Sequence, residues 1–139
     1  MASNISQIEV KATPEKIWEI LTSPEKVKLW QYGSELLTDW KVGSRVSFTN
    51  KWEDKVFEQY GTVLEFNPNK SLKYSLFFPK PDLEDKPENY FKMEYVLTQH
   101  GANTLVKIIQ EDNRPGAKQE APQGEENPIM KALKTLIES

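Results

Sequence analysis

The chain has 139 residues, of which 37% are apolar and 28% charged, a composition that predicts one globular domain over residues 1–139. Its formal net charge is −3, and only two of the 18 basic residues are arginines, so no basic footprint for nucleic acid is present. The absence of cysteine excludes disulfides, thiolate nucleophiles and cysteine-bound metal centres. No membrane-spanning segment or signal-peptide pattern is found, so we expect a cytoplasmic protein.

Two short helices are predicted near the N-terminus by a phrase that occurs twice, TPEKIW and SPEKVK. In the first copy, Thr13 is suited to the N-cap and Pro14 to the first helical position. In the second copy, Ser23 and Pro24 take the same places. A helix does not run easily through the second proline. We therefore expect the first helix to end near Thr22 and the second to begin immediately afterwards.

Alternating apolar residues predict a series of strands. The predicted strands are joined by short turns, which favours antiparallel pairing between neighbours. They cover residues 5–12, 45–52, 55–66, 72–78, 90–98 and 104–112. The charged segment Phe77–Tyr90 is predicted as a loop, either a plain exposed connection or a lid over a cavity mouth. The polar segment 113–127 is predicted as a flexible loop.

The chain ends in a predicted amphipathic helix. Asn127 can cap it and Pro128 can start it. Its apolar residues fall at helical spacing on one face and are Ile129, Met130, Leu133, Leu136 and Ile137. The predicted order is α+β: one strand, two short helices, a run of strands and a last helix. We expect the last helix to cover the concave face of the sheet.

These features together resemble the START-like (SRPBCC) helix-grip superfamily. Within it, the likeness is closest to small proteins similar to the C-terminal domain of activators of the heat-shock chaperone ATPase. The paired proline-started helices carry Trp18 and Trp30. The turn VGSR resembles the family's Val-Gly-Gly-Arg, with Ser44 in place of the second glycine, and the turn from Asn67 to Leu72 resembles the family's strand-linking segment.

The resemblance implies an α+β helix-grip fold: a curved antiparallel sheet of six or seven strands, two short helices and a long C-terminal helix over the concave face. It also implies an apolar cavity between the sheet and that helix. The chain departs from the family at the start of the last helix, where Ile129 and Met130 stand in place of a common tryptophan.

Candidate ligand-binding residues are the apolar and aromatic side chains expected on the concave side. The alternative is that they fill the core and leave no cavity, and a slip of one residue in strand register would turn them outward. Tyrosine hydroxyls among them would act as polar handles in a ligand pocket. The set is Val46, Phe48, Trp52, Tyr74, Leu76, Phe78, Phe91, Met93, Tyr95, Met130 and Leu133.

Catalytic and metal-binding signals are weak. The only histidine, His100, lies in a predicted turn, a poor place for a buried base. No calcium-binding or phosphate-binding loop pattern is present, and we expect no metal and no cofactor. A strand carboxylate (Glu65, Glu94 or Glu111) would have a raised pKa if it faced the cavity and could then act as an acid.

Three functions follow, in descending order. The first is the binding of a small apolar or amphipathic molecule in the cavity. The second is an interaction with a heat-shock chaperone, implied by the resemblance. The third is an enzyme acting on a substrate held in the cavity. Nucleic acid and membrane are not expected as partners, and a homodimer is left open.

Overall fold

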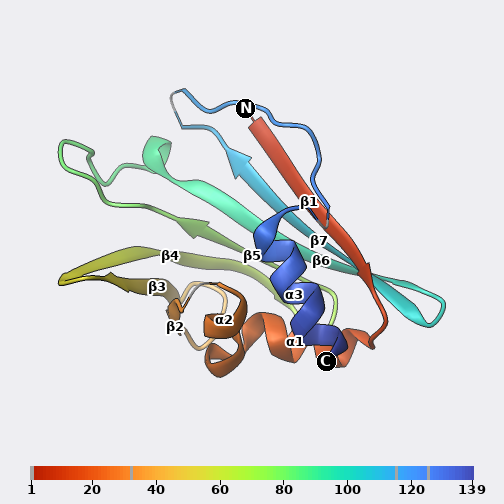
Figure 1. The fold of residues 1–139 in the computed structure, drawn as a ribbon. Helices are drawn as coiled ribbons and strands as arrows, with labels where there is room; N and C mark the ends of the chain where they lie inside the picture. Colours follow the sequence, from red (N-terminus) through yellow and green to blue (C-terminus); the bar gives the residue numbers. More distant parts are fainter. Residues whose placement is uncertain (1, 32, 115, 125) are drawn as a thin grey trace.

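The computed structural model describes residues 2–31, 33–114, 116–124 and 126–139, while the side chain of Trp52 lies outside the described part. In that part, seven strands and three α-helices follow the expected α+β order (Figure 1). The strands are β1 (Ala2–Val10), β2 (Glu35–Leu37), β3 (Arg45–Trp52), β4 (Lys55–Asn67), β5 (Ser71–Leu76), β6 (Phe91–His100) and β7 (Asn103–Asp112). The helices are α1 (Pro14–Thr22), α2 (Pro24–Trp30) and α3 (Pro128–Glu138), with a short 3-10 turn at Pro87–Asn89.

The strands form a single curved antiparallel sheet in the order β1-β7-β6-β5-β4-β3-β2. Helix α3 lies on the inner side of the curve, and α1 and α2 close one end (Figure 1). None of the helices in the described part of the chain is both long and apolar enough to cross a membrane.

The doubled phrase near the N-terminus forms two helices, as predicted. The Thr13 hydroxyl accepts a hydrogen bond from the backbone N–H of Lys16 at 3.3 Å, as an N-cap does. Ser23 is the N-cap residue of the second helix, as predicted, but its side chain makes no capping hydrogen bond. Its backbone N–H instead donates to the carbonyl of Glu19 and closes the first helix. The indole N–H of Trp30 donates to the carbonyl of Ile20 at 2.9 Å and ties α2 back to α1.

The core lies between the inner face of the sheet and α3. Leu72, Tyr74, Leu76 and Tyr95 point inward and are buried, which confirms the predicted register of β5 and β6. From α3, the buried side chains are Met130, Leu133 and Ile137. The Asn127 side chain caps this helix by accepting from the backbone N–H groups of Ile129 and Met130. The periodicity of the sequence therefore predicts which side of each element is buried.

Two strand predictions need correction. β2 was not expected, because three residues carry too little alternation to be recognised. The strand predicted at 72–78 ends at Leu76, where the chain leaves the inner face. Phe77 then pairs with Tyr60 of β4 by an isolated bridge and is buried against the rings of Tyr60 and Tyr90. Phe78 therefore does not continue the inward row.

The segment Phe77–Tyr90 is held against the outer face of the sheet. The hydroxyls of Tyr60 and Tyr90 donate to the Asp85 carboxylate at 2.5 and 2.6 Å. Arg45 stacks on the Tyr60 ring at 4.5 Å from its centroid. This cluster lies on the side of the sheet away from α3, so the segment is an anchored connection and the lid interpretation is not supported.

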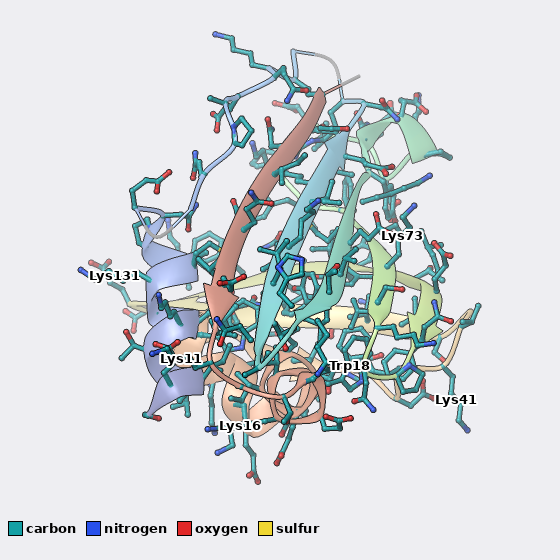
Figure 2. The ribbon with its side chains drawn as sticks, turned by 90° about the vertical axis from the view of Figure 1, so that its right-hand side faces the viewer. Lys11, Lys16, Trp18, Lys41, Lys73 and Lys131 are labelled. Carbon is teal, nitrogen blue, oxygen red and sulfur yellow. The ribbon has the colours of Figure 1, made fainter. Side chains whose placement is uncertain are left out.

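The outer face of the sheet carries the three strand glutamates considered as possible acids, Glu65, Glu94 and Glu111. The ammonium of Lys73, labelled in Figure 2, lies 3.8 Å from carboxylate oxygens of both Glu65 and Glu111. Glu94 alternates with the inward residues of β6 and so faces the same way. None of these three carboxylates faces the cavity, so the condition for a raised pKa and a role as an acid is not met by them.

Candidate ligand-binding pocket

A pocket of about 640 Å³ lies between the inner face of the sheet and the first turns of α3. Strands β3 to β7 supply its floor, while α2 contributes Trp30 and the residue that follows, Gln31. The segment 116–124, which we call the strap, lines a further side together with β1. The pocket thus brings together residues from both ends of the chain.

Seven of the eleven residues predicted from the sequence line this pocket: Phe48, Tyr74, Leu76, Phe91, Met93, Tyr95 and Met130. Val46 and Leu133 are completely buried in the core and do not line the pocket. Phe78 follows the end of β5 and lies 5.7 Å from the ammonium of Lys80, and the side chain of Trp52 lies outside the described residues. That the seven residues bind a ligand stays a prediction.

The pocket wall contains two buried tyrosine hydroxyls that bond each other. Those of Tyr74 and Tyr95 are 2.5 Å apart, and both side chains are buried. Gln31 also hydrogen-bonds Tyr95 through its side chain. Burial raises the pKa of Tyr95 to about 12 and raises that of Tyr74 well above its ordinary value. Both phenols are therefore neutral at physiological pH and act as hydrogen-bonding groups, not as bases.

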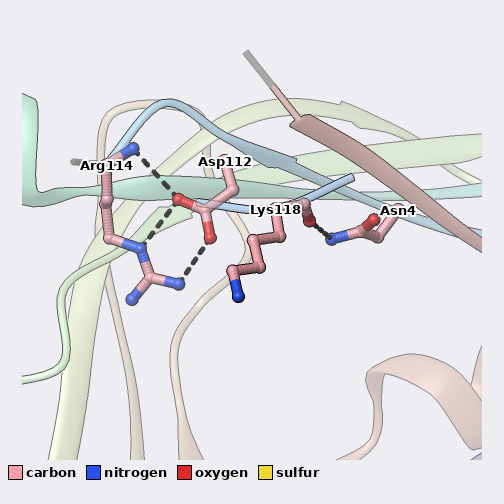
Figure 3. Close-up of polar contacts among 4 residues, drawn as sticks. All are labelled: Asn4, Asp112, Arg114 and Lys118. Atoms are coloured by element: carbon pink, nitrogen blue, oxygen red, sulfur yellow. Dashed lines mark hydrogen bonds and ion pairs between the residues drawn. The ribbon is translucent and has the colours of Figure 1, made fainter. Parts of the chain in front are cut away.

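An ion pair lies in the same wall, at the end of β7 (Figure 3). The Arg114 guanidinium donates from Nε and Nη2 to the two carboxylate oxygens of Asp112, at 2.8 and 2.6 Å. The backbone N–H of Arg114 donates to the same carboxylate at 3.1 Å. These hydrogen bonds lower the pKa of the Asp112 carboxyl, so it is ionised at neutral pH. The guanidinium also stacks on the ring of Phe91, with 4.5 Å from Cζ to the ring centroid.

The strap runs along the free edge of β1. The Asn4 side chain accepts from the backbone N–H of Glu120 at 2.7 Å. It also donates to the carbonyl of Lys118 at 3.4 Å (Figure 3). Gln123 exchanges two backbone hydrogen bonds of 2.9 Å with β1. The segment predicted as a flexible loop is therefore attached to the sheet, and several of its residues line the pocket.

Asp112, Arg114 and the strap were not predicted as site residues. A usable signal existed for Arg114, since arginine is rare in this chain. Both arginines stack on an aromatic ring, Arg45 on Tyr60 and Arg114 on Phe91, which a planar guanidinium does better than an ammonium. No sequence pattern places residues 116–124 beside β1, because these contacts join positions more than a hundred residues apart.

No group of three or more histidine, aspartate and glutamate side chains is placed to hold a metal ion among the described residues. His100 lies at the surface in a hairpin, with Nδ1 3.1 Å from a carboxylate oxygen of Glu9. The polar groups of the pocket are the tyrosine pair, the Asp112–Arg114 pair, Ser6, several side-chain amides, and Lys118 and Glu120 of the strap.

An inward-curved antiparallel sheet holding a C-terminal helix, with a pocket between them, defines a helix-grip protein of the START-like class. A sequence profile described as "Activator of Hsp90 ATPase homolog 1-like protein" matches residues 11–138. The chain belongs to this family.

Solved structures agree with this assignment. A Cytophaga hutchinsonii protein (ChR145) is 35% identical, over 81% of this chain and 78% of its own, with a TM-score of 0.66. The Aha1 dimer of Colwellia psychrerythraea is 20% identical, over 85% and 81% of the two chains, with a TM-score of 0.62. An HSP90 activator of Plasmodium falciparum is 18% identical, over 85% and 77%, with a TM-score of 0.64. The last two establish the shared fold alone. A search of curated protein sequences found no match.

Proposed function

We propose that this protein binds a small apolar or amphipathic molecule in the pocket between the sheet and α3. The observation that carries the proposal is the pocket itself, about 640 Å³ in volume, in which aromatic and aliphatic side chains and polar side chains line the wall in about equal number. Pockets of a few hundred Å³ that combine aromatic side chains with placed polar groups are found at small-molecule sites, and the high polar share here favours an amphipathic ligand.

Binding would be driven by removal of apolar ligand surface from water, worth roughly 25 cal/mol per Å². Met93 and Phe91 offer apolar contacts, and the tyrosine hydroxyls offer a fixed point for one polar group of the ligand. The pocket would contribute burial and orientation of the ligand, which is what a binding role requires.

Two measurements test the proposal. Native mass spectrometry of freshly purified protein is expected to detect a co-purified small molecule or, on titration, a complex with the neutral fluorescent probe N-phenylnaphthylamine. Met93→Trp, which fills the pocket, is expected to weaken probe binding. Val56→Trp, at an exposed position on β4, is the matched control and should bind as the wild type does. Absence of both a bound molecule and probe binding would refute the proposal.

A second candidate is activation of an Hsp90-type chaperone. It is supported by membership of the family and by the likeness to the Plasmodium falciparum activator. The test is the ATPase rate of purified Hsp90 with and without this protein, together with a pull-down of the chaperone. An unchanged rate and no recovered chaperone would exclude it.

Self-association is a further proposal, supported by the dimeric Colwellia psychrerythraea neighbour. Light scattering coupled to size-exclusion chromatography distinguishes a monomer from a dimer. A cytoplasmic location stays a prediction from the sequence.

A further inference from the structure

The Asp112–Arg114 pair gives the proposed pocket a preference for one kind of ligand. We infer that Asp112 acts as a built-in counter-ion that occupies Arg114 and so selects uncharged ligands over anionic ones. The inference rests on the proposed function, because it specifies the class of molecule that the same pocket takes. Asp112 is here a specificity-determining residue.

The positive charge of Arg114 is already compensated by the carboxylate of Asp112. Two parallel hydrogen bonds of 2.8 and 2.6 Å join Nε and Nη2 to the two carboxylate oxygens, the strongest arrangement available to an arginine. Only 9% of the Asp112 side chain is exposed, so this carboxylate is poorly hydrated and depends on its partner. Phe91 covers one face of the guanidinium. An anionic ligand that took the two N–H groups now bonded to Asp112 would leave this buried carboxylate with only the backbone N–H of Arg114, and one that left the pair intact would meet a guanidinium whose charge is already compensated, so both cases are unfavourable.

The remaining charges of the pocket lining do not reverse this preference. Lys118 and Glu120 both come from the strap and carry opposite charges. Both are exposed, so water screens them and either one contributes little to binding. With Asp112 and Arg114 the lining carries two positive and two negative groups, and only the carboxylate of Asp112 is buried.

What the site still offers is hydrogen bonding to neutral groups. An arginine side chain has five N–H donors. In Arg114, two of them are hydrogen-bonded to Asp112. The tyrosine pair has two hydroxyl protons, of which the bond between Tyr74 and Tyr95 uses one. These groups suit an uncharged molecule with carbonyl or hydroxyl oxygens, such as a ketone, an amide or an alcohol on an apolar frame.

Two probes with one ring system test the inference. N-phenylnaphthylamine is neutral, and anilinonaphthalenesulfonate is the same ring system with a sulfonate. Fluorescence titration gives the Kd of each, and the ratio of the two is the readout. Wild-type protein is expected to bind the neutral probe more tightly. Asp112→Asn frees Arg114 for the sulfonate, so the ratio should shift toward the anionic probe by about ten-fold.

The controls isolate the role of Arg114. Glu58→Gln makes the same change of charge at the partner of the other arginine, Arg45, on the outer face, and should leave the ratio as in wild type. In the double variant Asp112→Asn with Arg114→Met, the shift of the Kd ratio toward the sulfonate probe should disappear, because no guanidinium remains to bind the sulfonate.

The outcomes distinguish a failure of the inference about Asp112 from a failure of the proposed function. If the wild type binds the neutral probe but Asp112→Asn leaves the ratio unchanged, the inference is wrong and the proposed function stands. Wild-type protein that prefers the sulfonate would also overturn the inference, even if Asp112→Asn fails to fold. If no variant binds either probe, both the inference and the proposed function fail.

Discussion

The hydroxyl of Tyr74 lies 2.5 Å from that of Tyr95, and the two rings meet nearly edge-on, at 83° with 5.6 Å between centroids. The two residues stand on adjacent strands, β5 and β6, diagonally across the inner face of the sheet. Both hydroxyls are buried and need polar partners; that of Tyr74 bonds Tyr95, while Tyr95 also bonds the Gln31 side chain. This arrangement leads to the first two predictions.

Tyr95→Phe is expected to lower the free energy of unfolding by about 1–3 kcal/mol, because it leaves the buried Tyr74 hydroxyl without its partner. The double change Tyr74→Phe and Tyr95→Phe should cost less than the sum of the two single changes, since neither hydroxyl then remains unpaired. Urea unfolding of the four proteins measures this coupling. Tyr60→Phe, whose hydroxyl is at the surface, is the control and should cost less than Tyr95→Phe. Strictly additive losses would contradict the prediction.

Stability should decrease at alkaline pH. The folded-state pKa of Tyr95 is about 12, above the ordinary value of 10, because burial disfavours the phenolate. The unfolded chain therefore gives up this proton first, and stability that is complete below pH 10 is lost as pH rises from 10 to 12. A shift of this size corresponds to about 2–3 kcal/mol. Thermal melts between pH 8 and 11.5 should show a smaller loss in the double tyrosine variant than in wild type.

Leu133 and Met93 were both predicted as site residues, but their truncation should affect stability and ligand binding differently. Leu133 is completely buried in the core and lies outside the pocket lining, so Leu133→Ala should cost about 2–5 kcal/mol of stability. Met93 lines the pocket and is only partly buried, so Met93→Ala should cost less and should change the Kd for N-phenylnaphthylamine. Chemical unfolding and fluorescence titration of both variants are the measurements. Equal loss of stability in the two would argue that the pocket is filled in solution.

Gly61 on β4 is required by a close approach of β5. A Cβ at this position would lie 1.9 Å from the backbone carbonyl oxygen of Ser75, which cannot move without breaking the sheet. Gly61→Ala is therefore expected to cost about 3 kcal/mol or more. Gly101→Ala meets no atom within 4 Å and strains only a positive φ, so about 1 kcal/mol is expected. Melting temperatures of the two variants provide the comparison.

Asp85 should control the order of the segment Phe77–Tyr90 and not the pocket. Asp85→Ala removes the acceptor of both tyrosine hydroxyls, so amide hydrogen exchange in residues 80–89 should become faster. The Kd for N-phenylnaphthylamine should stay as in wild type, because the cluster lies on the outer face. A changed Kd would revive the lid interpretation.

The fold was predictable because its signals are local. Pro14 and Pro24 mark two helix starts, and alternation marks the inner face from Leu72 to Leu97. The alternation of apolar residues does not show where a strand ends if the chain changes direction over one or two residues. Phe78 was assigned to the inner row because the alternation continues through it, but pairing of Phe77 with Tyr60 ends that row.

The candidate site was predictable only in its apolar part. Phe48, Tyr74 and Tyr95 follow from strand periodicity, which distinguishes the inner from the outer face. Periodicity cannot distinguish a residue that lines a pocket from one that fills the core next to it, so Val46 and Leu133 were placed in the site. The Asp112–Arg114 pair depends on how the chain turns after β7, and the sequence carries no pattern for that turn.

The strap also protects the sheet. β1 is an edge strand, and an edge with free N–H and C=O groups is a template for pairing with another chain. Gln119 and Ser3 exchange hydrogen bonds, and Gln123 pairs with the backbone of β1, so the strap occupies this edge. Displacing the strap to enlarge the pocket would expose the edge. Loading with a large ligand and resistance to aggregation would then be linked through the same nine residues, 116–124.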